Sequence, residues 1–133
     1  MGEKDELDEF IVDENEPADK KILARIITPY VKSIGKNKVI DYSEEFDKAQ
    51  AWKKILIYLC CKKIMHVKGI VETEEAGPTE VATQTHISLD SAKNISRDDN
   101  LKKVVIGSKG NYYIPNYRLK KVKELLLGND YGN

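Results

Sequence analysis

The sequence contains little cysteine and little histidine, two residues of each in 133. Cys60 and Cys61 are adjacent within an apolar pattern of helical spacing, where neighbouring side chains do not face each other, so they cannot easily form a disulfide. We expect free thiols, buried or half-buried, in a reducing cytoplasm. His66 and His86 have no cysteine or carboxylate at ligand spacing, so the sequence predicts no metal site.

Long apolar runs are also missing. No segment approaches the roughly 20 apolar residues that a bilayer-spanning helix needs, and the acidic N-terminus lacks the apolar region of an export signal. No glycine-rich loop lies between a strand and a helix to hold a phosphate, and no nucleophile can be matched with a base. We therefore expect a cytoplasmic protein that is not an enzyme, with no cofactor, small-molecule ligand or membrane contact.

Charge is abundant but balanced, with 22 basic and 22 acidic residues, and 41% of the chain is hydrophobic. This composition and length predict one soluble domain. The charges are unevenly distributed, because residues 1–19 are strongly acidic and residues 101–127 are strongly basic. We expect an acidic flexible arm over 1–17, a single domain over 18–128 and a frayed tail over 129–133.

The first half of the chain has the apolar spacing of helices. One helix is predicted over 19–34, kinked or divided at Pro29. A longer helix is predicted from Glu44 to the neighbourhood of Gly69, capped by Ser43 or Asp41. Its apolar face holds Trp52 as a core anchor, and its solvated face holds the four lysines Lys53, Lys54, Lys62 and Lys63.

The segment GPTEVATQTHISLDSAKNISRDDN, residues 77–100, has the pattern of two short helices joined by a tight corner. Pro78 suits a first helical position, Ile87 is an isolated apolar residue that can fill the corner, and Ser88 is a strong N-cap. The second helix is predicted over 88–99. It should bury Ala92 and Ile95 and expose Asp90, Lys93, Asn94 and Arg97, while Leu101 folds back onto the core.

The following segment, KKVVIGSKGNYYIPNY, predicts a β-hairpin. Its strands are expected over 104–106 and 112–114, around the four-residue loop 107–110. Pro115 should end the hairpin, and Asn116 should cap a last helix that closes at Gly128.

Helix, helix, corner, helix, hairpin, helix is the element order of a winged helix-turn-helix domain. Residues 45–127 resemble the winged-helix DNA-binding domains of small prokaryotic, particularly archaeal, regulators. The matching pieces are GPTEVATQTHIS for the positioning helix and corner, SLDSAKNISRDD for the recognition helix and VVIGSKGNYYIP for the wing. The resemblance implies a mainly α fold with a small β-hairpin wing, here with extra N-terminal helices. This chain departs from the pattern at Asp99, where such domains usually carry a large apolar residue, and in the number of acids on the recognition helix.

The function that these features predict is binding of double-stranded DNA for transcriptional regulation. The helices before residue 66 are available as a homodimer interface, since palindromic sites require two-fold symmetry. The alternative is a winged-helix protein–protein interaction module without specific DNA binding, which accounts better for Asp98, Asp99 and the neutral net charge. The candidate DNA-binding residues are Ser88, Asp90, Ser91, Lys93, Asn94 and Arg97 in the recognition helix, Lys109 and Asn111 in the wing, and Arg118 and Lys120 at the last helix.

Overall fold

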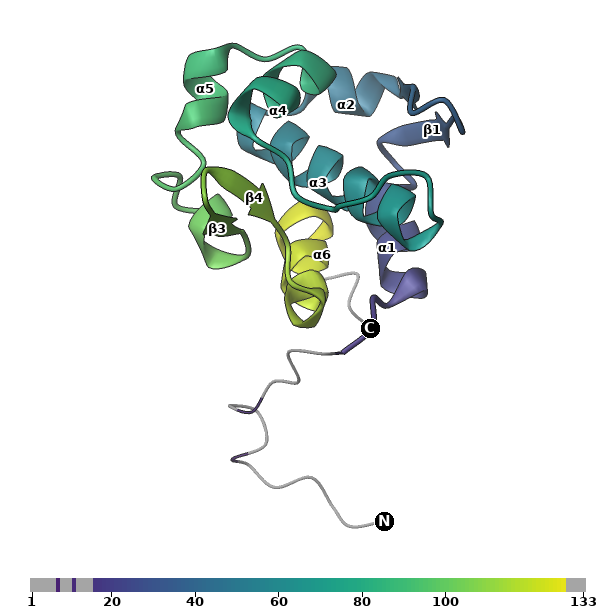
Figure 1. Ribbon diagram of the computed structural model, residues 1–133, viewed down its shortest axis with the longest axis vertical. Helices are drawn as coiled ribbons and strands as arrows, with labels where there is room; N and C mark the ends of the chain where they lie inside the picture. Colours follow the sequence, from purple (N-terminus) through teal and green to yellow (C-terminus); the bar gives the residue numbers. More distant parts are fainter. Residues whose placement is uncertain (1–6, 8–10, 12–15, 129–133) are drawn as a thin grey trace.

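A computed structural model describes residues 7, 11 and 16–128, which form a mainly helical fold with two small antiparallel hairpins (Figure 1). The predicted mainly α class with a small β-hairpin is confirmed. The hairpin over residues 31–42 was not predicted. Most of the predicted arm and the predicted tail lie outside the described residues. The elements are α1 (Lys20–Ile27), β1 (Val31–Ile34), β2 (Ile40–Tyr42), α2 (Glu44–Lys48), α3 (Ala51–Val67), α4 (Pro78–Thr85), α5 (Leu89–Lys93), η2 (Leu101–Lys103), β3 (Ile106–Ser108), β4 (Asn111–Tyr113), η3 (Asn116–Arg118) and α6 (Leu119–Leu127).

The predicted helix over 19–34 is wrong in its second half. Asp19 caps α1 through hydrogen bonds from the N–H groups of Lys21 and Ile22, but α1 ends at Ile27. Pro29 lacks the N–H that would continue the helix. The chain then forms β1, which pairs antiparallel with β2, and Lys38 in the intervening turn adopts a left-handed φ of 74°.

The predicted long helix is divided into α2 and α3 by an extended Ala49–Gln50 pair. Phe46 of α2 is 1% exposed and stacks on Tyr42 of β2, with ring centroids 3.6 Å apart. Ser43 precedes α2, but its hydroxyl donates to the carbonyl oxygen of Pro29 rather than capping the helix. Gly69 ends α3 as predicted, with a left-handed φ of 75° that suits glycine.

α3 is the central helix of the fold, and it packs against α1, α4 and β4. It is buried around nearly its whole circumference between residues 55 and 63, as expected for a helix that neighbours surround. The prediction of a solvated lysine face is therefore wrong for its last two members, since Lys62 is 9% and Lys63 only 1% exposed. None of the helices in the described part of the chain is long and apolar enough to cross a bilayer.

The C-terminal helix α6 packs against α1, so the two ends of the folded region are neighbours. Leu119 and Val122 supply its buried face. Gly128 closes it as predicted, with φ of 84°. Asn116 does not cap α6, because it begins η3 and its side chain contacts Lys63 and the carbonyl oxygen of Glu16 instead.

Candidate nucleic-acid interface

The candidate interface begins with α4 and the corner after it. Gly77 precedes α4 and Pro78 occupies its first turn, as predicted. Val81 and Thr85 are fully buried on the inner side. His86 then adopts a left-handed conformation with φ of 61°, which ends the helix and reverses the chain toward α5.

The start of α5 is fixed by its cap. The Ser88 hydroxyl oxygen accepts the Ser91 N–H at 3.1 Å and donates to the Ser91 hydroxyl at 3.0 Å. Ala92 and Ile95 are 0% and 1% exposed, so the predicted inner side is confirmed. The Ser88 side chain therefore fixes the first turn of α5.

The helix predicted over 88–99 is much shorter in the structure. α5 has five residues and ends at Lys93, with Asn94 as its C-cap. The chain continues in turns, where the Arg97 N–H and the Asp98 N–H both bond the Asn94 carbonyl oxygen. Asn, Ser and Asp are weak helix formers, because their side chains compete for backbone groups.

Three of the predicted contact residues form an exposed group on this short element. Lys93, Asn94 and Arg97 all face solvent. Within the described part of the chain, no carboxylate lies within ion-pair distance of the Lys93 or Arg97 side chains. Arg97 and Asp90, which are both exposed, do not form an ion pair with each other. The two cations are available to an external anion.

The acids that follow α5 have local roles. The Asp98 carboxylate accepts the N–H groups of Asn100 at 2.8 Å and Leu101 at 3.0 Å, just before and at the start of η2. Leu101 is buried as predicted, with 1% of its surface exposed. Asp99 pairs with Lys102 at 3.0 Å, in an exposed pair that contributes little to stability. The Asp98 carboxylate therefore binds backbone N–H groups of its own chain.

The hairpin near residues 104–114 is confirmed, but its boundaries shift. β3 and β4 are joined by the two-residue turn Lys109–Gly110, not by a four-residue loop. Both turn residues have positive φ, 53° and 85°, which characterises the turn type that matches strand twist. Lys109 is exposed at the tip. Val104 lies outside β3 and is fully buried.

The hairpin is attached to the start of α4. Ala76 and Tyr112 form an isolated antiparallel bridge, and a Cβ atom added to Gly77 would lie 3.0 Å from Oδ1 of Asn111. Asn111 is exposed, and its side chain approaches the first turn of α4. α5 and the β3–β4 hairpin lie at one side of the molecule, and α1 and β1 at the other (Figure 1).

Arg118 and Lys120 are not brought together with the α5 group. η3 and the first turn of α6 lie at the opposite end of the folded region from α5 (Figure 1). Lys120 is exposed, and the Arg118 guanidinium lies 5.6 Å from the ring centroid of Tyr117. Arg118 and Lys120 thus form a separate basic feature.

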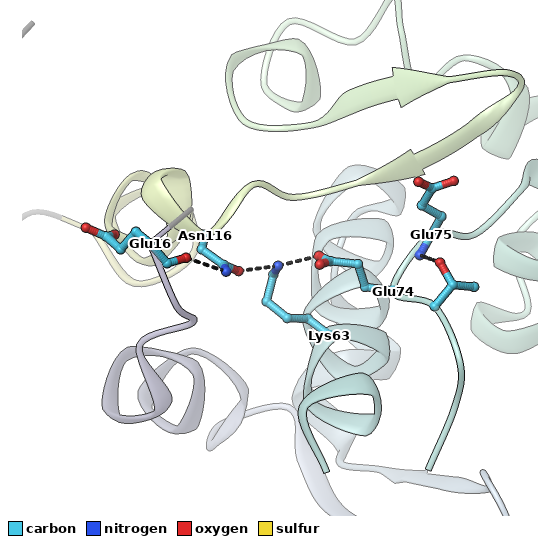
Figure 2. Close-up of polar contacts among 6 residues, drawn as sticks. Glu16, Lys63, Glu74, Glu75 and Asn116 are labelled. Carbon is cyan, nitrogen blue, oxygen red and sulfur yellow. Dashed lines mark hydrogen bonds and ion pairs between the residues drawn. The ribbon is translucent and has the colours of Figure 1, made fainter. Parts of the chain in front are cut away.

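Two polar clusters on α3 were missed by the sequence reading. In the first, the Glu80 carboxylate accepts hydrogen bonds at 2.5 Å from both the Tyr58 hydroxyl and the Lys62 ammonium, which joins α4 to α3. In the second, Lys63 donates to the Glu74 carboxylate and to Oδ1 of Asn116 (Figure 2).

These clusters had one usable signal in the sequence. Lys62 and Lys63 immediately follow a continuous apolar stretch of α3, so burial of the helix on all sides would carry them inward. Their partners lie far along the chain and carry no local signal.

Burial also raises the pKa values of a thiol and of a tyrosine hydroxyl on α3. It raises the pKa of the Cys60 thiol from 9.0 to about 12, partly opposed by nearby Lys63. It raises the pKa of the Tyr58 hydroxyl as well, and the hydrogen bond to Glu80 adds to that effect. Cys60 and Cys61 are free and fully buried, as predicted.

Among residues 7, 11 and 16–128, no three histidine, cysteine or acidic side chains are grouped so that they could hold a metal ion. No protein family, curated protein or solved structure matches this chain. The class that the structure defines is a mainly α protein with two small antiparallel hairpins.

Proposed function

We propose that this chain is a winged helix-turn-helix protein that binds double-stranded DNA and regulates transcription. The observation that carries the proposal is the exposed group Lys93, Asn94 and Arg97, which follows a capped helix-turn-helix corner and has no carboxylate partner among the described residues. Arginine and lysine recognise guanine edges and phosphates, and asparagine recognises adenine.

The short α5 defines how the group would meet DNA. Five helical residues span only about 7.5 Å at 1.5 Å per residue. The major groove would therefore receive α5 together with the turn from Asn94 to Arg97, rather than a long helix. Asp90 on the same exposed side would favour cytosine or an ordered water over phosphate.

The hairpin supports the same proposal as a backbone contact. Lys109 projects from the tip of a turn that is bonded back to the start of α4 through Ala76 and Tyr112. A cation held in this way can bind phosphate without sequence preference. Asn111, on the adjacent strand β4, would add a second contact to the DNA backbone.

Replacing Lys93 and Arg97 together by alanine tests the proposal. The matched control replaces Lys21 and Arg25, an exposed lysine and arginine on α1 at the other side of the molecule (Figure 1). Affinity for duplex genomic fragments is measured by fluorescence anisotropy at several salt concentrations. We expect the α5 double variant to bind at least about tenfold more weakly, the control to bind like the parent chain, and both to keep the parent melting temperature.

Equal affinities of the two double variants for DNA would show that α5 is not part of the interface. Absence of salt-dependent duplex binding by the parent chain would overturn DNA binding as a whole.

One observation favours a second candidate, a protein–protein interaction module. Leu89, the first residue of α5, is 41% exposed on the element that would enter the groove. The chain also has no net charge to attract DNA as a whole. If this candidate is right, Leu89→Asp abolishes partner capture, whereas the Lys93 and Arg97 double variant does not.

A further inference from the structure

An apolar groove lies between α1 and the C-terminal part of α3, away from the candidate interface. It has a volume of about 270 Å³. A second hollow of about 510 Å³ continues it toward β1, and the two share Ile64 and Lys68. Val67 within the groove is 39% exposed, although it is a large apolar residue. The apolar lining is Leu23, Ala24, Ile27, Ile64, Val67, Ile34 and Ile70.

The charged residues around this groove all carry the same sign. They are Lys20, Lys36 and Lys68, and no acidic residue contributes to the lining. Within the described part of the chain, none of the three has an ion-pair partner. Two such grooves cannot pack face to face, because six ammonium groups would meet at the same surface. The groove therefore fits a segment that is apolar in its centre and acidic at its edges.

The N-terminal arm of this chain has that composition. The run LDEFIVDENE over 7–16 places four large apolar residues among five acids. Ile11 is 73% exposed in the structure of the single chain. Exposed apolar side chains in an acidic segment are complementary to an exposed apolar groove with a basic edge.

The arm is attached to the folded region at its root. Asn116 donates to the Glu16 carbonyl oxygen at 2.8 Å (Figure 2), so the arm begins beside η3 and α6. The groove lies between α1 and α3, and its lining residue Lys20 is four positions after Glu16. Ile11 is 73% exposed in the structure of the single chain, so this side chain does not lie in the groove of its own chain. Fifteen residues beyond Glu16 extend up to about 50 Å, enough to reach a neighbouring molecule.

We propose that the acidic arm of one chain docks in the α1–α3 groove of a second copy, with Ile11 and its apolar neighbours inward, so that two chains exchange arms and form a dimer. Exchange of this kind gives two equivalent contacts related by two-fold symmetry. The proposal goes beyond DNA binding and does not rest on it, because the dimer forms without nucleic acid.

Oligomeric state in the absence of DNA tests this proposal. The parent chain is measured by light scattering during gel filtration, at micromolar to submillimolar concentrations and at low and high salt. We expect a dimer that dissociates more readily at high salt, since screening weakens the contact between acids and lysines. Ile11→Asp in the arm and Val67→Glu in the groove should each give a monomer.

Val39→Glu is the matched control for the groove variant. Val39 is 62% exposed and does not line the groove, so the same change there should leave the dimer intact. Melting temperatures close to that of the parent exclude unfolding as the cause of a monomer.

Mixing the two defective chains distinguishes arm exchange from ordinary surface contact. The Val67→Glu chain keeps an unchanged arm, and the Ile11→Asp chain keeps an unchanged groove. The mixture should therefore form heterodimers in which the arm of the first chain binds the groove of the second. A parent chain that is monomeric throughout the concentration range overturns the proposal, and so does a dimer that survives both changes. A monomer whose arm crosslinks to its own groove overturns the exchange in favour of docking within one chain.

Discussion

Ala76 and Tyr112 exchange both backbone hydrogen bonds, with N···O distances of 2.9 and 2.8 Å. Ala76 is 1% exposed and immediately precedes the cap of α4, and Tyr112 is the middle residue of β4. Buried backbone groups of this kind are costly to leave without partners. The pair therefore holds the β3–β4 hairpin in a fixed relation to α4, and through the corner to α5.

The cap of α5 gives a first prediction. Ser88→Ala removes the acceptor of the Ser91 N–H, so we expect a loss of about 1 kcal/mol in the free energy of unfolding. Urea denaturation measures it. Ser91→Ala is the control, because it leaves the capping acceptor in place, and it should cost less. Equal losses in the two variants would show that the cap does not stabilise the corner.

A second prediction concerns the hairpin tip. Lys109→Asn removes the cation but keeps a residue that tolerates positive φ. Binding to all duplexes should weaken alike, and the salt slope should fall by about one unit, as for one lost phosphate contact. Lys38→Asn is the control, since Lys38 has a similar conformation in the other hairpin. A loss confined to one DNA sequence would instead make Lys109 a base contact.

The buried lysine on α3 gives a third prediction. Glu74→Ala leaves the Lys63 ammonium buried with only Oδ1 of Asn116 as a partner, and should lower the free energy of unfolding by about 3 kcal/mol or more. Lys63→Met should cost less, because the Glu74 side chain is 25% exposed and can turn to water. Lys102→Ala, in an exposed pair, should change stability by less than about 0.5 kcal/mol. Denaturant unfolding that ranks these variants differently would contradict the assignment.

Alkaline pH should destabilise the fold. The Cys60 thiol has a pKa of about 12 when folded and 9.0 ordinarily, so its stabilising effect is present below pH 9 and is lost as pH rises toward 12. Between these values the unfolded chain releases a proton that the folded chain retains. The slope reaches about 1.4 kcal/mol per pH unit for one such thiol.

Urea denaturation at pH 8, 9 and 10 measures this slope. Cys60→Ala should make the decline shallower without removing it, since the pKa values of Cys61 and Tyr58 are also raised by burial. Stability that stays constant to pH 10 would contradict the prediction.

The local elements with strong sequence signals were predicted well, and the contacts between distant segments were not. Ser88, Pro78 and Gly69 occupy the expected cap and end positions because these signals act within a few residues. The apolar spacing over 22–34 fits a helix, yet Pro29 ends the helix and the later residues pair with β2, a partner that helical periodicity does not reveal.

The candidate site was predicted in part. Exposure of Lys93, Asn94 and Arg97 followed from helical spacing around Ala92 and Ile95. The early end of α5 was missed, because the helix was predicted to continue to Asp99 although the run from Asn94 to Asp99 is rich in weak helix formers. In the structure the Asp98 carboxylate instead accepts the N–H groups of Asn100 and Leu101.

Lys63 joins three parts of the chain that must first find one another. Its partners Glu74 and Asn116 are 11 and 53 residues away, and Asn116 in turn binds Glu16 across 100 residues. Contacts across long separations are entropically costly to close and tend to form late in folding. Loss of a late contact accelerates unfolding more than it slows folding. This cluster therefore sets how long the folded state lasts rather than how fast it forms.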